Sequence, residues 1–250
     1  MEEDQLNEQE SISDCIKKQG FYSQLFLSSG YLPQFGYSIG FFETYGHPEI
    51  ICFGLDLDLI DNIIQNAHRQ IKLGMRFEKD TSYGGFLEGY DIVFIDVMNG
   101  HQGDWVGYDA WYFKERKVPC LQLIWPDKNR KWPWEEEYNE DWKFIQPLLN
   151  RSPNYKFLES KNTGVLADKG LFDGTQSIVS VIHDSEGEWT FLSQRGFNPT
   201  WMEVYCLENV IRQDTTLNEV FNMNYGKQAV RNEKGGDWEY MLFEFGEDEE

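Results

Sequence analysis

Positive charge and long apolar runs are both scarce in this sequence. Lysine and arginine number 22 against 43 aspartates and glutamates, which gives a formal net charge of −21. Such a charge repels phosphate backbones and anionic lipids, so we expect neither nucleic acid nor a membrane as a partner. No stretch reaches the ~18 uninterrupted apolar residues that a membrane-spanning helix needs. We therefore expect no transmembrane segment.

The excess of acidic residues has two interpretations. A basic protein partner is favoured electrostatically, because complementary fields accelerate encounter and select partners. The alternative is that the charge only keeps the protein soluble. The sequence alone leaves both interpretations open.

Cysteine is scarce as well, and its spacing suggests no disulfide framework. The four residues form no C-x-x-C pair, and we interpret them as buried, reduced thiols: Cys15, Cys52, Cys120 and Cys206. The first ten residues, MEEDQLNEQE, are acidic, whereas a secretory signal has a positive start followed by an apolar run. We therefore expect a cytoplasmic protein.

Several common markers of catalysis are missing. The sequence has four histidines and no H-x-x-x-H or H-E-x-x-H pair, so we expect no zinc site or other metal site. It contains no P-loop and no G-x-G-x-x-G motif, which are the signatures of nucleotide triphosphatases and dinucleotide enzymes. The sequence thus favours binding over catalysis, and we assign no catalytic residue and no cofactor.

What the chain does have is apolar and aromatic residues, at 40% and 16% of the sequence, which is enough for a folded core. A helix after Ser11 should end at Gly20, and a second, amphipathic helix is predicted over 58–73 with five buried residues: Ile60, Ile63, Ile64, Ala67 and Ile71. Apolar and β-rich runs predict strands, the first two forming a hairpin, over 21–27, 35–42, 50–53, 90–97 and 120–125.

A second set of elements follows a weakly patterned stretch. Residues 177–183 and 188–194 predict a hairpin, and helices are expected over 203–211 and 217–223. The fold class is therefore α+β, with two domains that each hold a mainly antiparallel sheet with packed helices. The expected division is a disordered acidic end (1–10), an α+β domain (11–150), a linker (151–162), a smaller α+β domain (163–245) and an acidic tail (246–250).

Tryptophan is unusually concentrated in one region. Six of the nine tryptophans lie close together in sequence: Trp105, Trp111, Trp125, Trp132, Trp134 and Trp142. Indole rings suit both cores and binding surfaces, and their faces attract cations. Core packing of a sheet face and a surface for a cationic ligand are the two interpretations.

Several motifs in the first half resemble the bacterial family DUF4262. They include Tyr37-Ser-Ile-Gly-Phe41, Thr44-Tyr-Gly-His-Pro-Glu49 and Leu121-Gln-Leu-Ile-Trp-Pro-Asp127, followed by Trp132-Pro-Trp134. The resemblance covers roughly residues 14–150, in the order and spacing of the family. It implies no established activity, so no catalytic residue is inherited.

The same motifs suggest candidate binding residues. Polar or amphipathic groups stand in otherwise apolar strands, and we predict that they line a pocket where they converge: Tyr37, His47, Glu49, Gln122, Trp125 and Asp127. Buried polar groups need partners, so they must bond one another or face a cavity. We also predict that strands 50–53 and 120–125 are neighbours, which would bring at least two of these groups into one concave site.

Residues 163–242 more distantly resemble the DUF2185 type of domain, which occurs among bacterial toxin-immunity proteins. The shared pattern includes the segment His183-Asp-Ser-Glu-Gly-Glu-Trp189. This resemblance implies a bacterial cytoplasmic binding protein, an immunity or toxin-neutralising factor whose partner is a basic protein such as a toxin.

Two other functions stay open. One is a small-molecule binder or enzyme that uses the Trp-rich region around His47 and Gln122, with a flavin or nucleotide among the ligands considered. The other is a scaffold with no pocket.

Overall fold

The computed structural model describes residues 2–114 and 116–243. These residues divide into two compact units: the first extends to Ser28 and resumes over Pro33–Pro153, and the second holds Ser29–Leu32 and the described residues from Asn154 onward. Each unit contains one six-stranded sheet with accompanying helices. The prediction of a two-domain α+β fold is confirmed.

The boundary between the units differs from the expected division in one respect. It lies between Pro153 and Asn154, inside the stretch 151–162 expected to be a linker, but the segment Ser29–Leu32 belongs to the second unit. That assignment has no signal in the sequence. The expected acidic tail, 246–250, lies outside the described residues.

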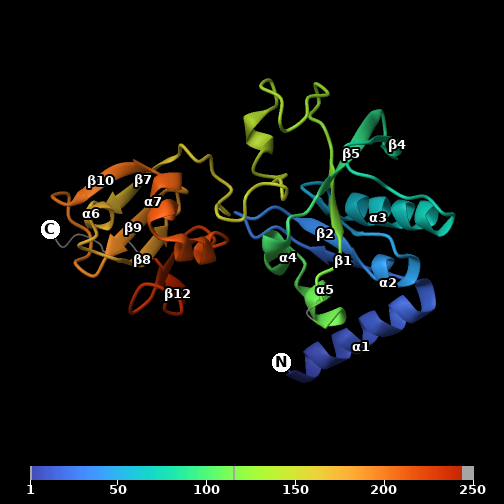
Figure 1. The fold of residues 1–250 in the computed structure, drawn as a ribbon, viewed down its shortest axis with the longest axis horizontal. Coiled ribbons are helices and arrows are strands. Elements are labelled where there is room, and N and C mark those ends of the chain that lie inside the picture. Colours follow the sequence, from blue (N-terminus) through green and yellow to red (C-terminus); the bar gives the residue numbers. More distant parts are fainter. Residues whose placement is uncertain (1, 115, 244–250) are drawn as a thin grey trace. The chain divides into compact units, whose positions relative to one another are not determined.

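The first unit contains six strands and five α-helices (Figure 1). The strands are β1 (Tyr22–Phe26), β2 (Phe35–Ile39), β3 (Glu49–Phe53), β4 (Ser82–Leu87), β5 (Tyr90–Asp96) and β6 (Cys120–Ile124). The helices are α1 (Glu2–Gln19), α2 (Phe41–Tyr45), α3 (Leu57–Lys72), α4 (Asn99–Trp105) and α5 (Gly107–Tyr112), with a 3-10 turn η1 (Glu140–Trp142).

The sheet of the first unit has the order β1-β2-β3-β6-β5-β4. β3 and β6 pair in parallel at its centre, and the other neighbours are antiparallel. All five residues of both central strands are buried, which explains their unbroken apolar character. The predicted β1–β2 hairpin and the predicted proximity of strands 50–53 and 120–125 are confirmed.

Helix α3 covers one face of this sheet and contacts β1, β2 and β3. Its apolar side chains recur at helical spacing and are buried, as predicted: Ile60, Ile63, Ile64, Ala67 and Ile71. On the other face, Trp105 of α4 packs edge-on against Phe35 and Phe53, with ring centroids 5.4 and 5.0 Å apart. The sheet is therefore buried between two layers.

Helix α1 begins earlier than the sequence indicates. Residues 1–10 were expected to be disordered, but the helix already starts at Glu2. Glu and Gln, which dominate this stretch, have high helix propensity, so a charged composition does not by itself exclude a helix. The end is as predicted: Gly20 has a φ of +91° and its N–H donates to the Ile16 carbonyl at 2.7 Å.

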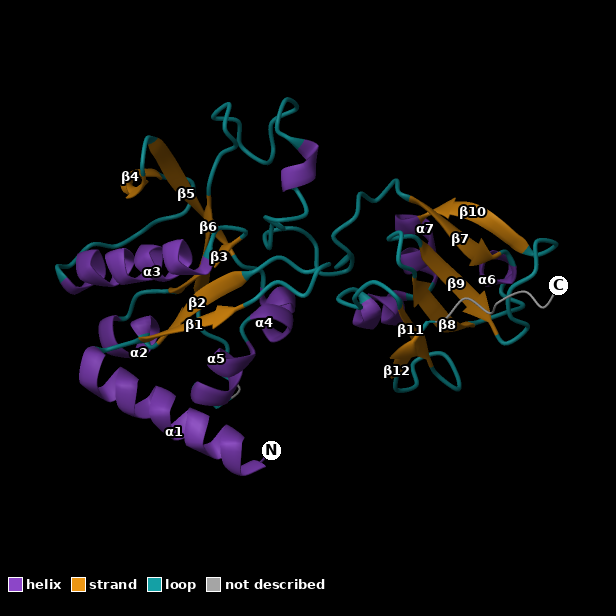
Figure 2. Ribbon diagram, turned by 180° about the vertical axis from the view of Figure 1, so that it is seen from behind, coloured by secondary structure: helices purple, strands orange, loops and turns teal. Residues whose placement is uncertain are grey.

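The second unit contains six strands (Figure 2). They are β7 (Gly164–Asp168), β8 (Ile178–His183), β9 (Trp189–Ser193), β10 (Met202–Cys206), β11 (Lys227–Val230) and β12 (Glu239–Leu242). Its helices are α6 (Gly170–Asp173), α7 (Leu207–Gln213) and a 3-10 helix η2 (Thr215–Val220).

The second sheet has the order β10-β7-β9-β8-β11-β12, in which only β7 and β9 are parallel neighbours. The predicted hairpin is confirmed as β8 and β9. The helix predicted over 203–211 is partly wrong, since residues up to Cys206 form β10. Antiparallel pairing of this segment with β7 prevails over its helical pattern.

The segment Ser29–Leu32 is held in the second unit by a buried carboxylate. The Tyr31 hydroxyl donates to Glu159 at 2.9 Å, and the Trp189 indole N–H donates to the same carboxylate at 2.6 Å. The ring of His183 stacks on Trp189 with centroids 3.8 Å apart. All four side chains are buried.

The four cysteines carry free thiols, but only two of them are in the core. Cys52 and Cys120 are buried, Cys15 is half-buried, and Cys206 is exposed at the end of β10. The prediction that all four are buried is therefore wrong for Cys15 and Cys206.

Within the described residues, no helix combines the length and the apolar character needed to cross a membrane.

Candidate functional site

The carboxylate of Glu49, the first residue of β3, is buried at the N-terminus of α2. The Ser38 hydroxyl donates to it at 2.6 Å, and three consecutive backbone N–H groups donate at 2.9–3.2 Å, from Gly40, Phe41 and Phe42. The first N–H groups of a helix lack partners within the helix, so a carboxylate there is stabilising. Burial nevertheless raises the pKa of Glu49 to about 7. This carboxylate fixes the turn from β2 into α2.

His47 lies between α2 and β3 and is completely buried. The Phe77 backbone N–H donates to its Nε2 at 3.1 Å, so Nδ1 carries the proton and donates to the Pro48 carbonyl oxygen at 2.7 Å. Burial lowers the pKa of the imidazole, which favours this neutral ring. Both ring nitrogens are therefore engaged by backbone groups.

Gln122 and Asp127 are also buried and bonded to backbone. The Gln122 amide donates to the Pro147 carbonyl at 2.7 Å and accepts from the Leu149 N–H at 2.8 Å. The Asp127 carboxylate accepts from three N–H groups at 2.8–3.2 Å, those of Asn129, Lys131 and Asn139. These bonds hold the long segment after β6 in place.

Trp125 and Tyr37 serve packing. The Trp125 indole N–H donates to the Phe53 carbonyl at 2.8 Å, and its ring joins the core beneath α3. The Tyr37 ring is stacked near Phe26 and Phe35, at centroid distances of 5.8 and 6.4 Å. Both residues are buried, with at most 4% of their surface exposed.

The six predicted residues do not gather at one point. Glu49 is in register with Cys120, at the start of the central strand pair, whereas Trp125 and Asp127 follow its end. Five residues of extended chain, roughly 16 Å, separate Cys120 from Trp125. Apart from the Ser38 hydroxyl, which donates to Glu49, the hydrogen-bond partners described above for these side chains are backbone groups. Their role in a ligand site stays a prediction.

Strand β12 forms an open edge of the second sheet. Among the described residues it pairs with β11 only, at the end of the strand order, and all four of its residues are exposed. Three of them are large and apolar, with exposed fractions of 53% for Tyr240, 42% for Met241 and 67% for Leu242. Natural sheet edges are usually charged or covered, because an open apolar edge can pair with another chain.

The hydrogen bonding between β11 and β12 shows which peptide groups face outward. The Phe243 N–H donates to the Gly226 carbonyl at 2.9 Å, and such bonds alternate along an antiparallel strand. Every second residue therefore bonds to β11, whereas the N–H and C=O groups of Tyr240 and Leu242 point away from it. β12 thus has two residues whose N–H and C=O groups point outward, beside exposed apolar side chains.

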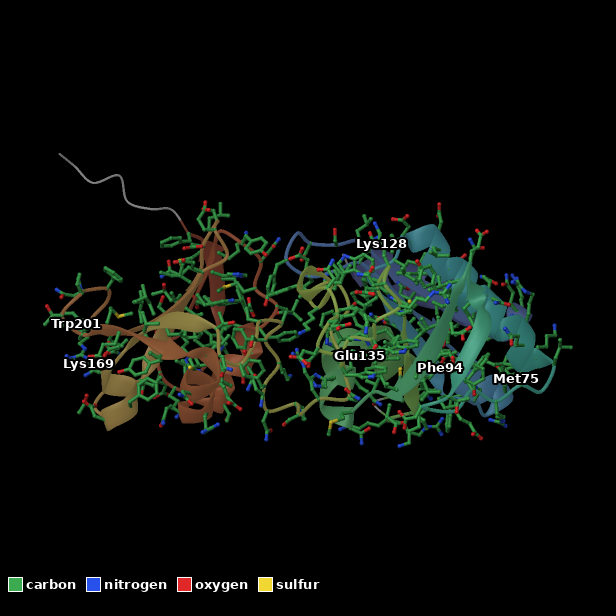
Figure 3. The ribbon with its side chains drawn as sticks, turned by 90° about the horizontal axis from the view of Figure 1, so that it is seen from above. Met75, Phe94, Lys128, Glu135, Lys169 and Trp201 are labelled. Atoms are coloured by element: carbon green, nitrogen blue, oxygen red, sulfur yellow. The ribbon has the colours of Figure 1, made fainter. Side chains whose placement is uncertain are left out.

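The opposite edge of the same sheet, β10, has a similar backbone and fewer apolar side chains. The Lys169 N–H donates to the Trp201 carbonyl at 2.9 Å, and both residues lie at this end of the unit (Figure 3). By the same alternation, the N–H of Val204 points outward. Val204 is 70% exposed and is the one large exposed hydrophobic residue among the five of β10.

A family model described as "Domain of unknown function (DUF4262)" matches residues 15–139, half of the chain. The chain belongs to the DUF4262 family. The resemblance drawn from the sequence motifs is thereby confirmed, and the DUF4262 region contains all six predicted binding residues. No curated protein and no solved structure matches the chain. The likeness of the C-terminal unit to DUF2185 domains stays a prediction.

The tryptophans of the DUF4262 region divide between core and surface. Trp105 and Trp125 are each 4% exposed, in agreement with core packing. Trp134 is 52% exposed and stacks on Trp132, with centroids 5.5 Å apart and ring planes 3° apart. The surface interpretation therefore applies to this stacked pair, and Trp111 is half-buried.

In the described part of this DUF4262 chain the structure shows no cluster of metal ligands, and the buried thiol of Cys52 is not activated. Across residues 2–114 and 116–243, no three His, Cys, Asp or Glu side chains are placed to hold a metal ion. Burial raises the pKa of Cys52 to about 12, whereas a nucleophilic cysteine needs a lowered pKa.

Gln122→Leu tests whether the DUF4262 motif serves the fold. We expect the variant to lose about 1–3 kcal/mol of unfolding free energy for each of the two backbone groups left unpaired. Urea denaturation measures this loss. The control is Gln65→Leu on α3, where the side chain makes one 3.5 Å bond to Asp61 and the cost should stay within about 0.5 kcal/mol. Equal losses in both variants would contradict a structural role for Gln122.

Proposed function

We propose that this protein acts by binding a basic protein partner through strand β12. The observation that carries the proposal is the open, apolar edge, whose outward peptide groups at Tyr240 and Leu242 face no strand in the described part of the chain. An extended segment of the partner would add to this edge. In such strand addition, main-chain hydrogen bonds provide affinity and alternate side chains provide specificity.

The charge of the chain supports a basic partner. A net charge of −21 attracts a positively charged protein over a distance set by ionic strength and raises its association rate. The Debye length is about 8 Å at physiological salt, so this steering weakens as salt is added. The edge then supplies the short-range contacts.

Within this class we propose an immunity role in the bacterial cytoplasm, where the acidic chain binds a basic toxin and blocks it. The charge and the open edge support this role. The alternative of a small-ligand site around His47 and Gln122 has less support, because the polar atoms of both side chains bond to backbone.

Leu242→Pro tests the proposal by removing one outward N–H while leaving the bonds to β11 intact. The protein is first used to capture partners from native lysate, and the main captured protein is identified by mass spectrometry and purified. We expect that protein to be basic and its Kd to rise at least about tenfold with Leu242→Pro, the equivalent of one lost hydrogen bond.

Val204→Pro is the matched control, since it removes an outward N–H at the other edge of the same sheet. It should leave the Kd unchanged. Leu242→Ala keeps the N–H and isolates the contribution of the side chain, and thermal unfolding establishes that each variant is folded. An acidic captured protein, or equal losses with Leu242→Pro and Val204→Pro, would refute binding at β12.

A further inference from the structure

We propose that a surface cavity in the first unit binds a small multivalent anion. The cavity has a volume of about 440 Å³, within the range of small-molecule sites. Figures 1 and 2 both show the C-terminal end of α1 beside α2. Residues of these two helices line the cavity, together with Lys72 at the end of α3 and Tyr112 of α5. None of the six motif residues lines it.

The charge of the cavity is opposite to that of the chain. Three lysines line it, Lys17, Lys18 and Lys72, against one carboxylate, that of Glu43. The whole sequence has almost twice as many acidic as basic residues, so a locally basic cavity is a marked departure. Three lysines around one hollow favour a ligand with phosphate or carboxylate groups.

Two of the three ammonium groups are available. Within the described residues, Lys18 and Lys72 have no carboxylate within 4.0 Å, whereas Lys17 lies 3.2 Å from Asp14 in an exposed pair. Glu43, the one acidic residue among those lining the cavity, accepts a hydrogen bond from the Tyr112 hydroxyl. Burial and, to a smaller extent, this bond raise the pKa of Tyr112, so the tyrosine is neutral. The carboxylate is thus occupied while the lysines are not.

The neutral part of the wall has a defined shape. The Tyr45 hydroxyl lies 2.8 Å from Nε2 of His68 on α3, which fixes the ring at the cavity. A side chain at Gly20 would place its Cβ 2.3 Å from the same hydroxyl, so the close approach of α1 to Tyr45 depends on glycine. The aromatic ring and the ammonium groups together suit an anion that carries an organic part.

The competing explanation is that the lysines only offset helix dipoles. Lys17 and Lys18 lie in the last turn of α1 and Lys72 in the last turn of α3, where cations are favourable. That role predicts lower stability when the lysines are neutralised and no effect on anion binding. The two explanations therefore differ in a measurable way.

Isothermal titration of the full chain with pyrophosphate and with citrate tests the site and separates phosphate from carboxylate ligands. We expect one of the two probes to bind in the wild type, and Lys18→Gln and Lys72→Gln each to weaken it about tenfold. The control Lys117→Gln removes one exposed lysine elsewhere in the unit and should leave binding unchanged. Thermal unfolding in parallel confirms that the variants fold.

Three other outcomes would overturn the proposal. Absence of binding by both probes at millimolar concentration would refute an anion site. An equal loss of affinity with Lys117→Gln would show that only the net charge of the chain matters. Lower melting temperatures with unchanged anion binding would show that the lysines only stabilise the helix ends.

Discussion

Replacing Arg231 with methionine should lower the unfolding free energy of the C-terminal unit by about 3–5 kcal/mol. Its guanidinium lies 2.7 Å from the Asp214 carboxylate, and both side chains are completely buried. Methionine fills similar volume without charge, so Asp214 would remain buried without its close cation. Removing one partner of a buried ion pair is far more costly than removing both.

Arg231 also joins several elements, which adds to the expected effect. It donates to the Ile178 carbonyl at 2.8 and 3.0 Å and to the Thr216 hydroxyl at 2.7 Å, and its guanidinium carbon lies 4.2 Å from the ring centroid of Trp238. It thereby connects β8, η2 and the approach to β12. Hydrogen exchange of the β8 and β11 amides should measure the loss, because it reports local opening of one unit.

The double variant Arg231→Met/Asp214→Asn is the control. It leaves no unpaired charge at this buried position and should recover a large part of the lost stability. A single-variant cost below about 1 kcal/mol would contradict the prediction and would indicate that Lys234, 3.9 Å from Asp214, replaces the missing cation.

Glu49 should make the stability of the first unit fall as pH rises from 4.5 to 7. Its folded pKa of about 7 exceeds the ordinary value of 4.5, chiefly because of burial. In this window the folded chain keeps a proton that the unfolded chain has released, so stability is greatest below pH 4.5 and is lost as pH rises through 7. Integrated over the window, the change is roughly 3 kcal/mol.

The difference between the wild type and Glu49→Gln isolates this contribution. Other groups shift the profile too: burial lowers the pKa of His47, which acts in the opposite direction, but this term is shared by both proteins and cancels. Urea denaturation at a series of pH values should give a difference that falls across the window and is flat outside it. Glu88→Gln, in the exposed β4–β5 turn, is the charge control, and a flat difference for Glu49→Gln would contradict the prediction.

Local patterns predicted much of the first unit. α3 was predictable because its five buried residues recur at helical spacing, and β3 and β6 because short apolar runs are typical of strands buried on both faces. The start of α1 and the strand β10 were not predicted. In β10, tertiary pairing with β7 decided the structure of a segment whose sequence also fits a helix.

For the candidate site, the sequence indicated which polar groups would be buried but not what they would bond. His47, Glu49 and Gln122 do have partners, as buried polar groups must. Apart from the Ser38 hydroxyl that donates to Glu49, those partners are backbone groups, which occur at every residue and therefore cannot be recognised from composition. The β12 edge was missed for a related reason, since its exposed apolar residues resemble a short core strand until the sheet order is known.

The segment Ser29–Leu32 makes the C-terminal unit discontinuous along the chain, with a consequence for its synthesis. Tyr31 leaves the ribosome 128 residues before Glu159, the carboxylate to which its hydroxyl donates. At 5–20 residues per second, that interval is roughly 6–26 s. Residues 154–243 alone therefore do not form the complete second unit. A gene segment that encodes only these residues would include Glu159 and Trp189 but not Tyr31, whose hydroxyl donates to Glu159.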